Sequence, residues 1–328
     1  YLHCEAIHVA PGVRICEHIK MTLIYWHDAA LNHVTPPGHP ERVARAEAVT
    51  AALSELDGLD WRDAPLADRA EVLRCHPESY YEGIEAAIPT EGYVSLDADT
   101  HVSPGSLDAA MRALGGCVSA VDAVLAGGDK TAFVAMRPPG HHAETATAMG
   151  FCLFGNAAIA AKRALDHHGL SRVAVLVFDV HHGNGTQDLL WEEARTLFCS
   201  SHQMPLYPGS GGAHETGAVD NVINAPLAPM SGGAEMRKAW GDIILPAVDD
   251  FAPELVIISA GFDAHANDPL AILKWTAEDF RWVTGAICKV AEAHAGGRVV
   301  STLEGGYDLD ALAASTAAHV RVLMERGA

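Results

Sequence analysis

The chain has 328 residues, of which 49% are hydrophobic and 20% charged, and its formal net charge at pH 7 is -20. This composition is typical of a globular protein and excludes a disordered or collagen-like chain. A surface with so large an excess of carboxylates repels phosphate backbones, so we expect no binding to nucleic acid. The apolar runs are far shorter than the roughly 20 residues that span a bilayer, so we expect no membrane anchor.

The seven cysteines are scattered along the chain, and no two of them form a CxxC pair. This spacing argues against a disulfide framework and a thiolate zinc site, and it predicts reduced, mostly buried thiols.

Residues 1–20 lack periodicity, so we expect an N-terminal extension before a core domain of residues 21–328. We find no signal-peptide pattern and therefore expect a cytoplasmic protein. The sequence leaves the oligomeric state open, a homo-oligomer included.

From Met21 onward the chain repeats a short apolar run, a polar loop and a helical stretch. The apolar runs predicted as strands are 132–136, 173–178, 197–200, 255–260 and 299–303. They are apolar throughout, as in strands that are buried on both faces of a parallel sheet. The predicted helices are 40–56, 106–125, 156–167, 236–251, 277–293 and 309–325. This alternation predicts one doubly wound α/β domain.

Each predicted strand is followed by a segment rich in His, Asp, Glu or Tyr. These segments are 137–142, 179–185, 200–209, 261–268 and 304–307. In open α/β sheets, ligands bind in the crevice beyond the carboxyl ends of the strands. The five segments lie far apart in the chain, but their common position predicts one shared site.

Asp179 and His181 are the first candidates for metal ligands. They are two residues apart at the end of an extended run, so their side chains leave the same face. Asp263, at the end of another strand, can supply a third ligand. Three protein ligands and an open position are typical of a catalytic zinc site, although this oxygen-rich set also suits iron(II) or manganese. Without Asp263, a hydrogen-bonded Asp–His pair would be the simpler interpretation.

His141 and His142 follow Pro-Pro-Gly, and adjacent histidines suit a division of labour. One could take a proton from an attacking water while the other supplies charge or a hydrogen bond. Tyr307 follows two glycines and could donate to the oxyanion that forms when water attacks an amide carbonyl. For each motif alone, the simpler alternatives are solvent-facing loop histidines and an ordinary Gly-Gly-Tyr turn.

Together these motifs resemble the histone deacetylase family, in the bacterial branch of deacetylase-like amidohydrolases that includes acetylpolyamine amidohydrolases. The matching segments follow the family's order and cover about residues 21–325: 39–42, 137–143, 149–152, 179–187, 207–209, 259–270 and 304–308. The resemblance implies an arginase/deacetylase fold, with a central, mostly parallel sheet of about eight strands flanked by helices.

The resemblance also implies roles for individual residues. It implies that zinc is held by Asp179, His181 and Asp263. It implies that His142 acts as general base and then acid, that His141 is its electrostatic partner, and that Tyr307 polarises the substrate carbonyl. The walls of the family's acyl-lysine tunnel are matched by Gly150, Phe151 and Tyr207. For either aromatic residue alone, ordinary core packing is the simpler interpretation.

The chain departs from the family at Val177. The family usually reads Asp-x-Asp-x-His-His, and Val177 stands where the first aspartate is expected. That carboxylate ordinarily orients the histidine matched by His141 and helps to hold a structural potassium ion. We therefore expect a less positively charged His141 and a weakened or altered potassium site. Asn184 matches the partner of His142, and Ser200 is a candidate near the cation site.

The sequence thus predicts zinc-dependent hydrolysis of an N-acyl amide in a small molecule or peptide. The sequence does not choose among acetyl-lysine, an acetylated polyamine and another small amide as the substrate. Selectivity is set by the loops at the rim of the site and not by the residues around the metal. Asp97 and Asp99 are candidates for a rim carboxylate, with a solvated turn as the alternative. Two other functions remain: an arginase-type two-metal ureohydrolase that uses His265 and Asp268, and a catalytically weakened protein that binds acylated ligands.

Overall fold

The computed structural model describes residues 21–327. Its centre is an eight-stranded sheet in the order β2-β1-β5-β10-β9-β6-β7-β8, in which every neighbouring pair is parallel. The strands are β1 (Thr22–Trp26), β2 (Leu59–Asp63), β5 (Thr131–Val134), β6 (Val173–Phe178), β7 (Thr196–Gln203), β8 (Val222–Leu227), β9 (Leu255–Ala260) and β10 (Val299–Leu303). The predicted parallel sheet of about eight strands is confirmed. A separate antiparallel pair consists of β3 (Val94–Ser95) and β4 (His101–Val102).

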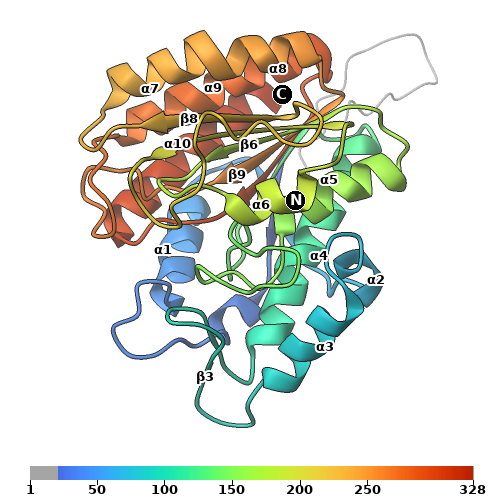
Figure 1. The fold of residues 1–328 in the computed structure, drawn as a ribbon, viewed down its shortest axis with the longest axis vertical. Helices are drawn as coiled ribbons and strands as arrows, with labels where there is room; N and C mark the ends of the chain where they lie inside the picture. The colour runs from blue at the N-terminus through green and yellow to red at the C-terminus, as the bar shows by residue number, and fades with distance from the viewer. Residues whose placement is uncertain (1–20, 328) are drawn as a thin grey trace, which may run out of the picture.

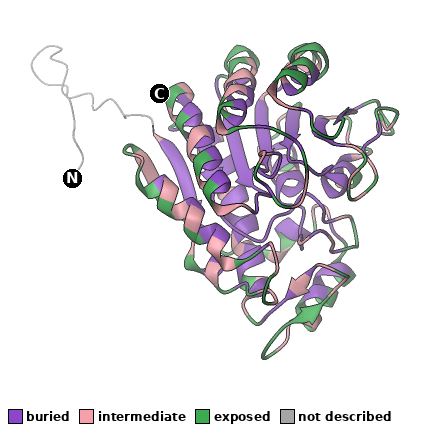
Figure 2. Cartoon of the chain, turned by 90° about the vertical axis from the view of Figure 1, so that its left-hand side faces the viewer, coloured by how far each residue is buried: buried purple, intermediate pink, exposed green. Residues whose placement is uncertain are grey.

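Helices cover both faces of the sheet (Figure 1). They are α1 (Val43–Ser54), α2 (Arg69–Val72), α3 (Glu78–Ala87), α4 (Ser106–Leu125), α5 (Asn156–Asp166), α6 (Asn184–Leu190), α7 (Gly233–Ala239), α8 (Leu245–Phe251), α9 (Ala277–His294) and α10 (Leu309–Gly327). The core on one face includes side chains of α1 and α7–α10, and the core on the other includes α4, α5 and α6. In Figure 2 the central strands of the sheet are buried, while the outer sides of the helices are exposed.

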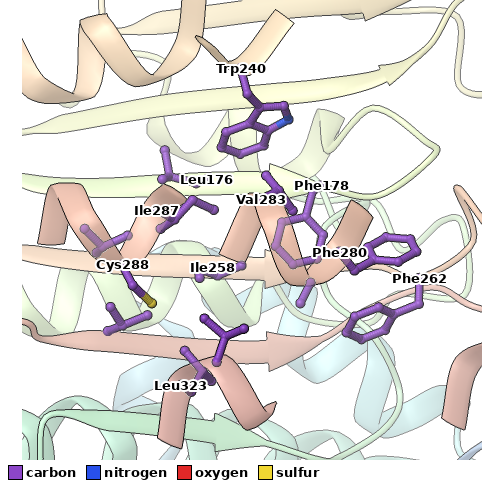
Figure 3. Close-up of a cluster of buried hydrophobic side chains, with 14 of the residues drawn as sticks. Leu176, Phe178, Trp240, Ile258, Phe262, Phe280, Val283, Ile287, Cys288 and Leu323 are labelled. Atoms are coloured by element: carbon purple, nitrogen blue, oxygen red, sulfur yellow. The ribbon is translucent and has the colours of Figure 1, made fainter. Parts of the chain in front are cut away.

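Strand β6 shows why the central strands read as unbroken apolar runs. Ala174, Leu176 and Phe178 pack into one core, and Val173 and Val175 pack into the core on the opposite face. Both faces are covered by helices, so every position on the strand favours an apolar side chain. Figure 3 shows Leu176 and Phe178 within the first of these cores. Burying each such side chain contributes roughly 1.5–3 kcal/mol to stability.

The predicted helices are found with two differences. Helix α1 begins at Val43 rather than at residue 40, and Glu41 lies instead in a buried ion pair with Arg137. The predicted helix 236–251 is interrupted by a π-helical turn at Trp240–Ile244 between α7 and α8. Pro246 lies just beyond this turn and has no N–H to donate to the preceding turn of a regular α-helix, so the hydrogen-bond pattern must change there.

Of the eight strands of the central sheet, the sequence analysis did not predict β1, β2 and β8. Strand β2 (LDWRD) is the edge strand, and its residues are at least partly exposed, so it lacks an apolar run. Strand β8 lies at the opposite edge and contains Asn224 and Pro226. Proline is tolerated at a sheet edge because its missing N–H removes no hydrogen bond to a neighbouring strand. Strand β7 extends beyond residue 200, through Ser201, His202 and Gln203.

Five of the seven cysteines lie in the described part, and all five are free thiols, as predicted. Four of them are buried: Cys117, Cys152, Cys199 and Cys288. Between residues 21 and 327, no helix is both long enough and apolar enough to cross a membrane. The predicted N-terminal extension, residues 1–20, lies outside the described residues and stays a prediction.

Candidate metal and catalytic site

Four neighbouring strands, β5, β10, β9 and β6, carry the candidate residues at their carboxyl ends. Because these strands run parallel, their carboxyl ends lie at the same edge of the sheet. His141 and His142 lie in the loop after β5, and Tyr307 follows β10. Asp263 follows β9 and Asp179 follows β6, so residues distant in sequence become neighbours.

The predicted metal ligands converge on one point. Nδ1 of His181 lies 3.1 Å from Oδ1 of Asp179 and 3.1 Å from Oδ2 of Asp263. The backbone orients both carboxylates: the N–H of Val180 donates to Asp263 (2.7 Å), and the N–H of Gly305 donates to Asp179 (3.0 Å). All three ligand side chains are buried. The imidazole nitrogen is therefore held equally close to two carboxylates.

The electrostatics of this cluster suit a bound cation. Burial and the neighbouring Asp179 raise the pKa of Asp263 to about 8. Burial alone would lower the pKa of His181, but its hydrogen bonds to the two carboxylates outweigh this effect and raise the pKa to about 10. Among residues 21–327, no lysine or arginine forms an ion pair with either carboxylate. A metal ion would displace the protons that His181 and Asp263 hold at neutral pH, so metal binding should release protons.

The donor set fits a divalent transition metal. One ligand atom from each of Asp179, His181 and Asp263 lies within 4.8 Å of the others. One imidazole and two carboxylates suit zinc or iron(II), and three protein ligands leave room for water or substrate.

A second buried group consists of His141, Cys152 and Glu304, which also offer ligand atoms within 4.8 Å of one another. The Glu304 carboxylate already accepts three hydrogen bonds. Burial and the neighbouring Glu304 raise the pKa of Cys152 well above its usual range, which keeps the thiol protonated. The carboxylate of this group is thus already used by backbone and hydroxyl donors, and its thiol is protonated, so Asp179, His181 and Asp263 are the better metal ligands.

His142 is held in the tautomer that a general base needs. Its Nδ1 lies 2.7 Å from Oδ1 of Asn184, whose Nδ2 donates to Oε1 of Glu144 (2.8 Å). The bond to Glu144 fixes the orientation of the Asn184 amide, so Nδ1–H donates to its oxygen and the Nε2 lone pair of His142 stays free. Burial and the neighbouring His141 and His181 lower the pKa of His142 well below its usual range, so the ring is neutral.

Tyr307 is positioned by groups on both sides of its backbone. Its N–H donates to Oδ2 of Asp268 (2.8 Å), and the buried Arg45 donates to the carbonyl of Gly306 (2.6 Å). The Arg45 guanidinium also lies over the Tyr307 ring, 4.9 Å from its centre. Burial raises the pKa of the Tyr307 phenol well above its usual range, so the hydroxyl stays protonated and can donate.

The predicted tunnel residues lie around the candidate catalytic side chains His142 and Tyr307. The Tyr207 ring is 5.2 Å from that of His142, and the Phe151 ring is 5.8 Å from that of Tyr307. Gly150 has a φ of +55°, and a side chain there would overlap the His142 ring. Only glycine allows the chain to pass this close to the base.

The surroundings of Val177 explain what the departure from the family changes. Val177 is fully buried and packs against Phe198 and Val222. Val177 and His141 both lie against Gly183, and Nδ1 of His141 is buried without a hydrogen-bond partner. Val177 offers no acceptor to this nitrogen and no carboxylate to a cation. The weakened potassium site stays a prediction.

For two other candidates the structure shows local hydrogen bonds, while the rim role of Asp97 and Asp99 and the cation-site role of Ser200 stay predictions. Oδ1 of Asp97 accepts the N–H groups of Asp99 and Thr100, at 3.0 and 2.6 Å, so Asp97 stabilises a turn. The Ser200 hydroxyl lies 3.0 Å from Nδ1 of His202.

The residues considered as ligands of a second metal do not join the metal cluster. His265 accepts a backbone N–H from Asn267, and Asp268 positions Tyr307.

The sequence analysis missed Glu144 and Arg45 as parts of the site, and it did not assign Glu304 and Asp268 the role of accepting backbone N–H groups. Each lies within a motif that was recognised or close to one, but none carries an obvious chemical role. A charged residue beside a predicted strand end, in a segment that must be buried, is the signal that could have identified them.

Comparisons with known proteins show which family this chain resembles. The model of the histone deacetylase domain matches residues 39–323. The histone deacetylase-like amidohydrolase of Pseudomonas aeruginosa is 39% identical over 303 residues, which cover 87% of this chain and 80% of that protein. A probable deacetylase of Archaeoglobus fulgidus is 37% identical, with 88% and 82% covered.

A solved structure, the HDA15 HD domain, matches with a TM-score of 0.89 and 31% sequence identity, covering 93% of this chain and 88% of that chain. Such similarity along nearly the whole chain extends to the order and arrangement of the elements, and it confirms the arginase/deacetylase fold. The chain therefore belongs to the histone deacetylase family.

Proposed function

We propose that this protein is a zinc-dependent amidohydrolase that removes the acyl group from N-acyl amides. The observation that carries the proposal is the cluster of Asp179, His181 and Asp263 beside a neutral, oriented His142. Membership of a family of deacetylases and amidohydrolases supports the same reaction class.

In the proposed reaction, Asp179, His181 and Asp263 hold the metal. Bound zinc would polarise the amide carbonyl and lower the pKa of the attacking water from 15.7 toward ~7. His142 accepts the proton of that water at Nε2 and later returns a proton to the leaving amine. The rings of His141 and His142 lie 3.9 Å apart, so His141 acts on the same proton transfers electrostatically.

Tyr307 donates its hydroxyl hydrogen to the carbonyl oxygen as negative charge develops there. A donor of this kind typically contributes about 3–4 kcal/mol to transition-state stabilisation. Phe151 and Tyr207 enclose the aliphatic chain that leads to the amide, with Gly150 leaving room beside the base. We propose acetyl-lysine, acetylated polyamines and other small linear amides as the substrate class.

A substrate panel on the zinc-loaded protein tests this function. The panel compares acetyl-lysine peptides, acetylputrescine-type amines, longer acyl chains and aryl amides, with released amine as the measurement. We expect turnover of at least one linear amide and one zinc per chain. A fully zinc-loaded protein that cleaves none of them would overturn the assignment and favour an acyl-binding protein. A requirement for two metals would favour the ureohydrolase.

A further inference from the structure

Glu304 links two strand ends of the site. It follows β10 and is fully buried. Oε2 accepts the N–H of Gly140 (2.7 Å) and the N–H of His141 (3.1 Å), while Oε1 accepts the Ser259 hydroxyl (2.7 Å). Two of these donors belong to the loop that carries the catalytic histidines. A side chain after one strand thus holds the backbone after its neighbour, β5.

This loop needs such an anchor because it has no regular structure. Residues 135–142 belong to no helix or strand. The backbone of His141 is nevertheless held on both sides, because its N–H donates to Glu304 and its carbonyl accepts from Thr186 (3.1 Å).

The His141 side chain, by contrast, has no close anchor. Its Nδ1 has no hydrogen-bond partner, and its Nε2 is 3.8 Å from the nearer carboxylate oxygen of Asp179. Val177 borders the same glycine, Gly183, and presents only methyl groups. The orientation of His141 therefore depends on its backbone and on packing against the His142 ring.

We propose that Glu304 is a positioning residue for His141 and His142, and that the chain depends on it because Val177 offers His141 no acceptor. Glu304 acts through the backbone amides of Gly140 and His141 and does not touch the substrate. The inference rests on the proposed amidohydrolase function, since it concerns the placement of that reaction's base.

Two conservative substitutions of Glu304 separate the effect of its side-chain length from the effect of its charge. Glu304→Gln keeps the length: its amide oxygen can accept both N–H groups, and its amide nitrogen can donate to Ser259. Glu304→Asp keeps the charge but is about 1.5 Å shorter, the length of one C–C bond, and cannot span both partners. A positioning role predicts that the glutamine variant is the better enzyme, whereas a role of charge predicts the reverse.

The expected effects fall on kcat. Glu304→Asp should lower kcat by about 10²-fold, because a misplacement of about 1 Å at a catalytic group has this effect. Glu304→Gln should stay within about 3-fold of the wild type in kcat. KM should change little in either variant, because Phe151 and Tyr207 are untouched.

A second measurement does not depend on activity. In metal-free protein, hydrogen–deuterium exchange of the peptide 137–143 should be faster in Glu304→Asp and unchanged in Glu304→Gln, because only the shorter side chain releases the two amides.

Val177→Asp tests the dependence on residue 177. An aspartate there gives Nδ1 of His141 an acceptor, so adding it to Glu304→Asp should recover at least about 5-fold in kcat, a coupling that a double-mutant cycle measures. Val177→Asn supplies a neutral acceptor, and it replaces Val177→Asp in the cycle if the aspartate variant does not fold.

Equal kcat values and equal exchange rates in Glu304→Asp and Glu304→Gln would overturn the role of Glu304. Strictly additive effects of the two substitutions would overturn its link to Val177. A wild type that is inactive with zinc bound would instead contradict the proposed function, and the exchange measurement would still decide the role of Glu304.

Discussion

At the scale of single residues, the site depends on how each polar group is held. His142 is neutral because it is buried beside two other histidines, and its tautomer follows from Asn184 and Glu144. Tyr307 keeps its proton because it is buried. These are the protonation states that a base and a donor need at neutral pH.

Replacing either group should lower kcat with little effect on KM. We expect Tyr307→Phe to lower kcat by about 10²–10³-fold, through loss of a donor to the oxyanion. We expect His142→Gln to lower it by about 10²–10⁴-fold, through loss of the base. Steady-state kinetics on the best substrate of the panel and zinc content by elemental analysis provide the check. Tyr25→Phe, whose hydroxyl donates to a distant backbone carbonyl, is the matched control. Full activity with zinc retained would contradict the assigned role of the substituted residue.

At the scale of elements, polar groups buried between the sheet and its helices link stability to pH. His319 on α10 is fully buried, and its ring nitrogens lie 2.7 Å from the Thr284 hydroxyl and 2.9 Å from the Ser301 hydroxyl. Burial lowers the pKa of His319 from 6.5 to about 3. In the unfolded chain the ring is exposed and regains its ordinary pKa. Protons therefore bind the unfolded chain preferentially below pH 6.5, and stability falls as the pH drops.

His319 should account for about 1.6 kcal/mol of the stability lost between pH 6.5 and 5.0, because protonation of the unfolded ring costs up to about 1.4 kcal/mol per pH unit below its pKa. Urea unfolding at the two pH values measures this loss. His319→Gln keeps a hydrogen-bonding side chain and should reduce the loss by that amount. His167→Gln, which replaces an exposed histidine at the end of α5, should leave the loss unchanged. An unchanged loss in His319→Gln would show that His319 is not the linked group.

At the scale of the whole molecule, the candidate metal ligands join the ends of β6 and β9, so metal binding there would be coupled to folding. A ligand that binds only the folded state stabilises it by about 4 kcal/mol at a concentration a thousandfold above its Kd. A bound cation would offset the repulsion between the Asp179 and Asp263 carboxylates, which otherwise raises the pKa of Asp263.

Removing the metal with a chelator should abolish turnover and lower the melting temperature. Added zinc should restore both, whereas magnesium, which prefers a shell of oxygen ligands, should not. Differential scanning calorimetry of metal-free and zinc-loaded protein measures the shift. In Asp263→Asn the shift should be much smaller, and in Asp249→Asn, at the end of α8, it should match that of the wild type. Chelation that left both turnover and melting temperature unchanged would contradict a metal-dependent enzyme.

The sequence by itself determined the parallel sheet, because strands buried on both faces must be apolar throughout, as β6 and β9 are. It also determined which residue types collect at the strand ends, since that chemistry lies in short motifs such as Asp179-Val-His181. It could not identify the edge strands β2 and β8, whose partial exposure removes the apolar signal.

Only the tertiary structure decided how these motifs meet. The order β5-β10-β9-β6 brings His141, Tyr307, Asp263 and Asp179 to one edge of the sheet. It also decided the roles of Glu304 and Asp268, because a carboxylate acts on whichever backbone amides face it, and those amides belong to segments distant in the sequence. Hydrogen bonds and burial depend on neighbours in space, whereas apolar periodicity depends on neighbours in sequence.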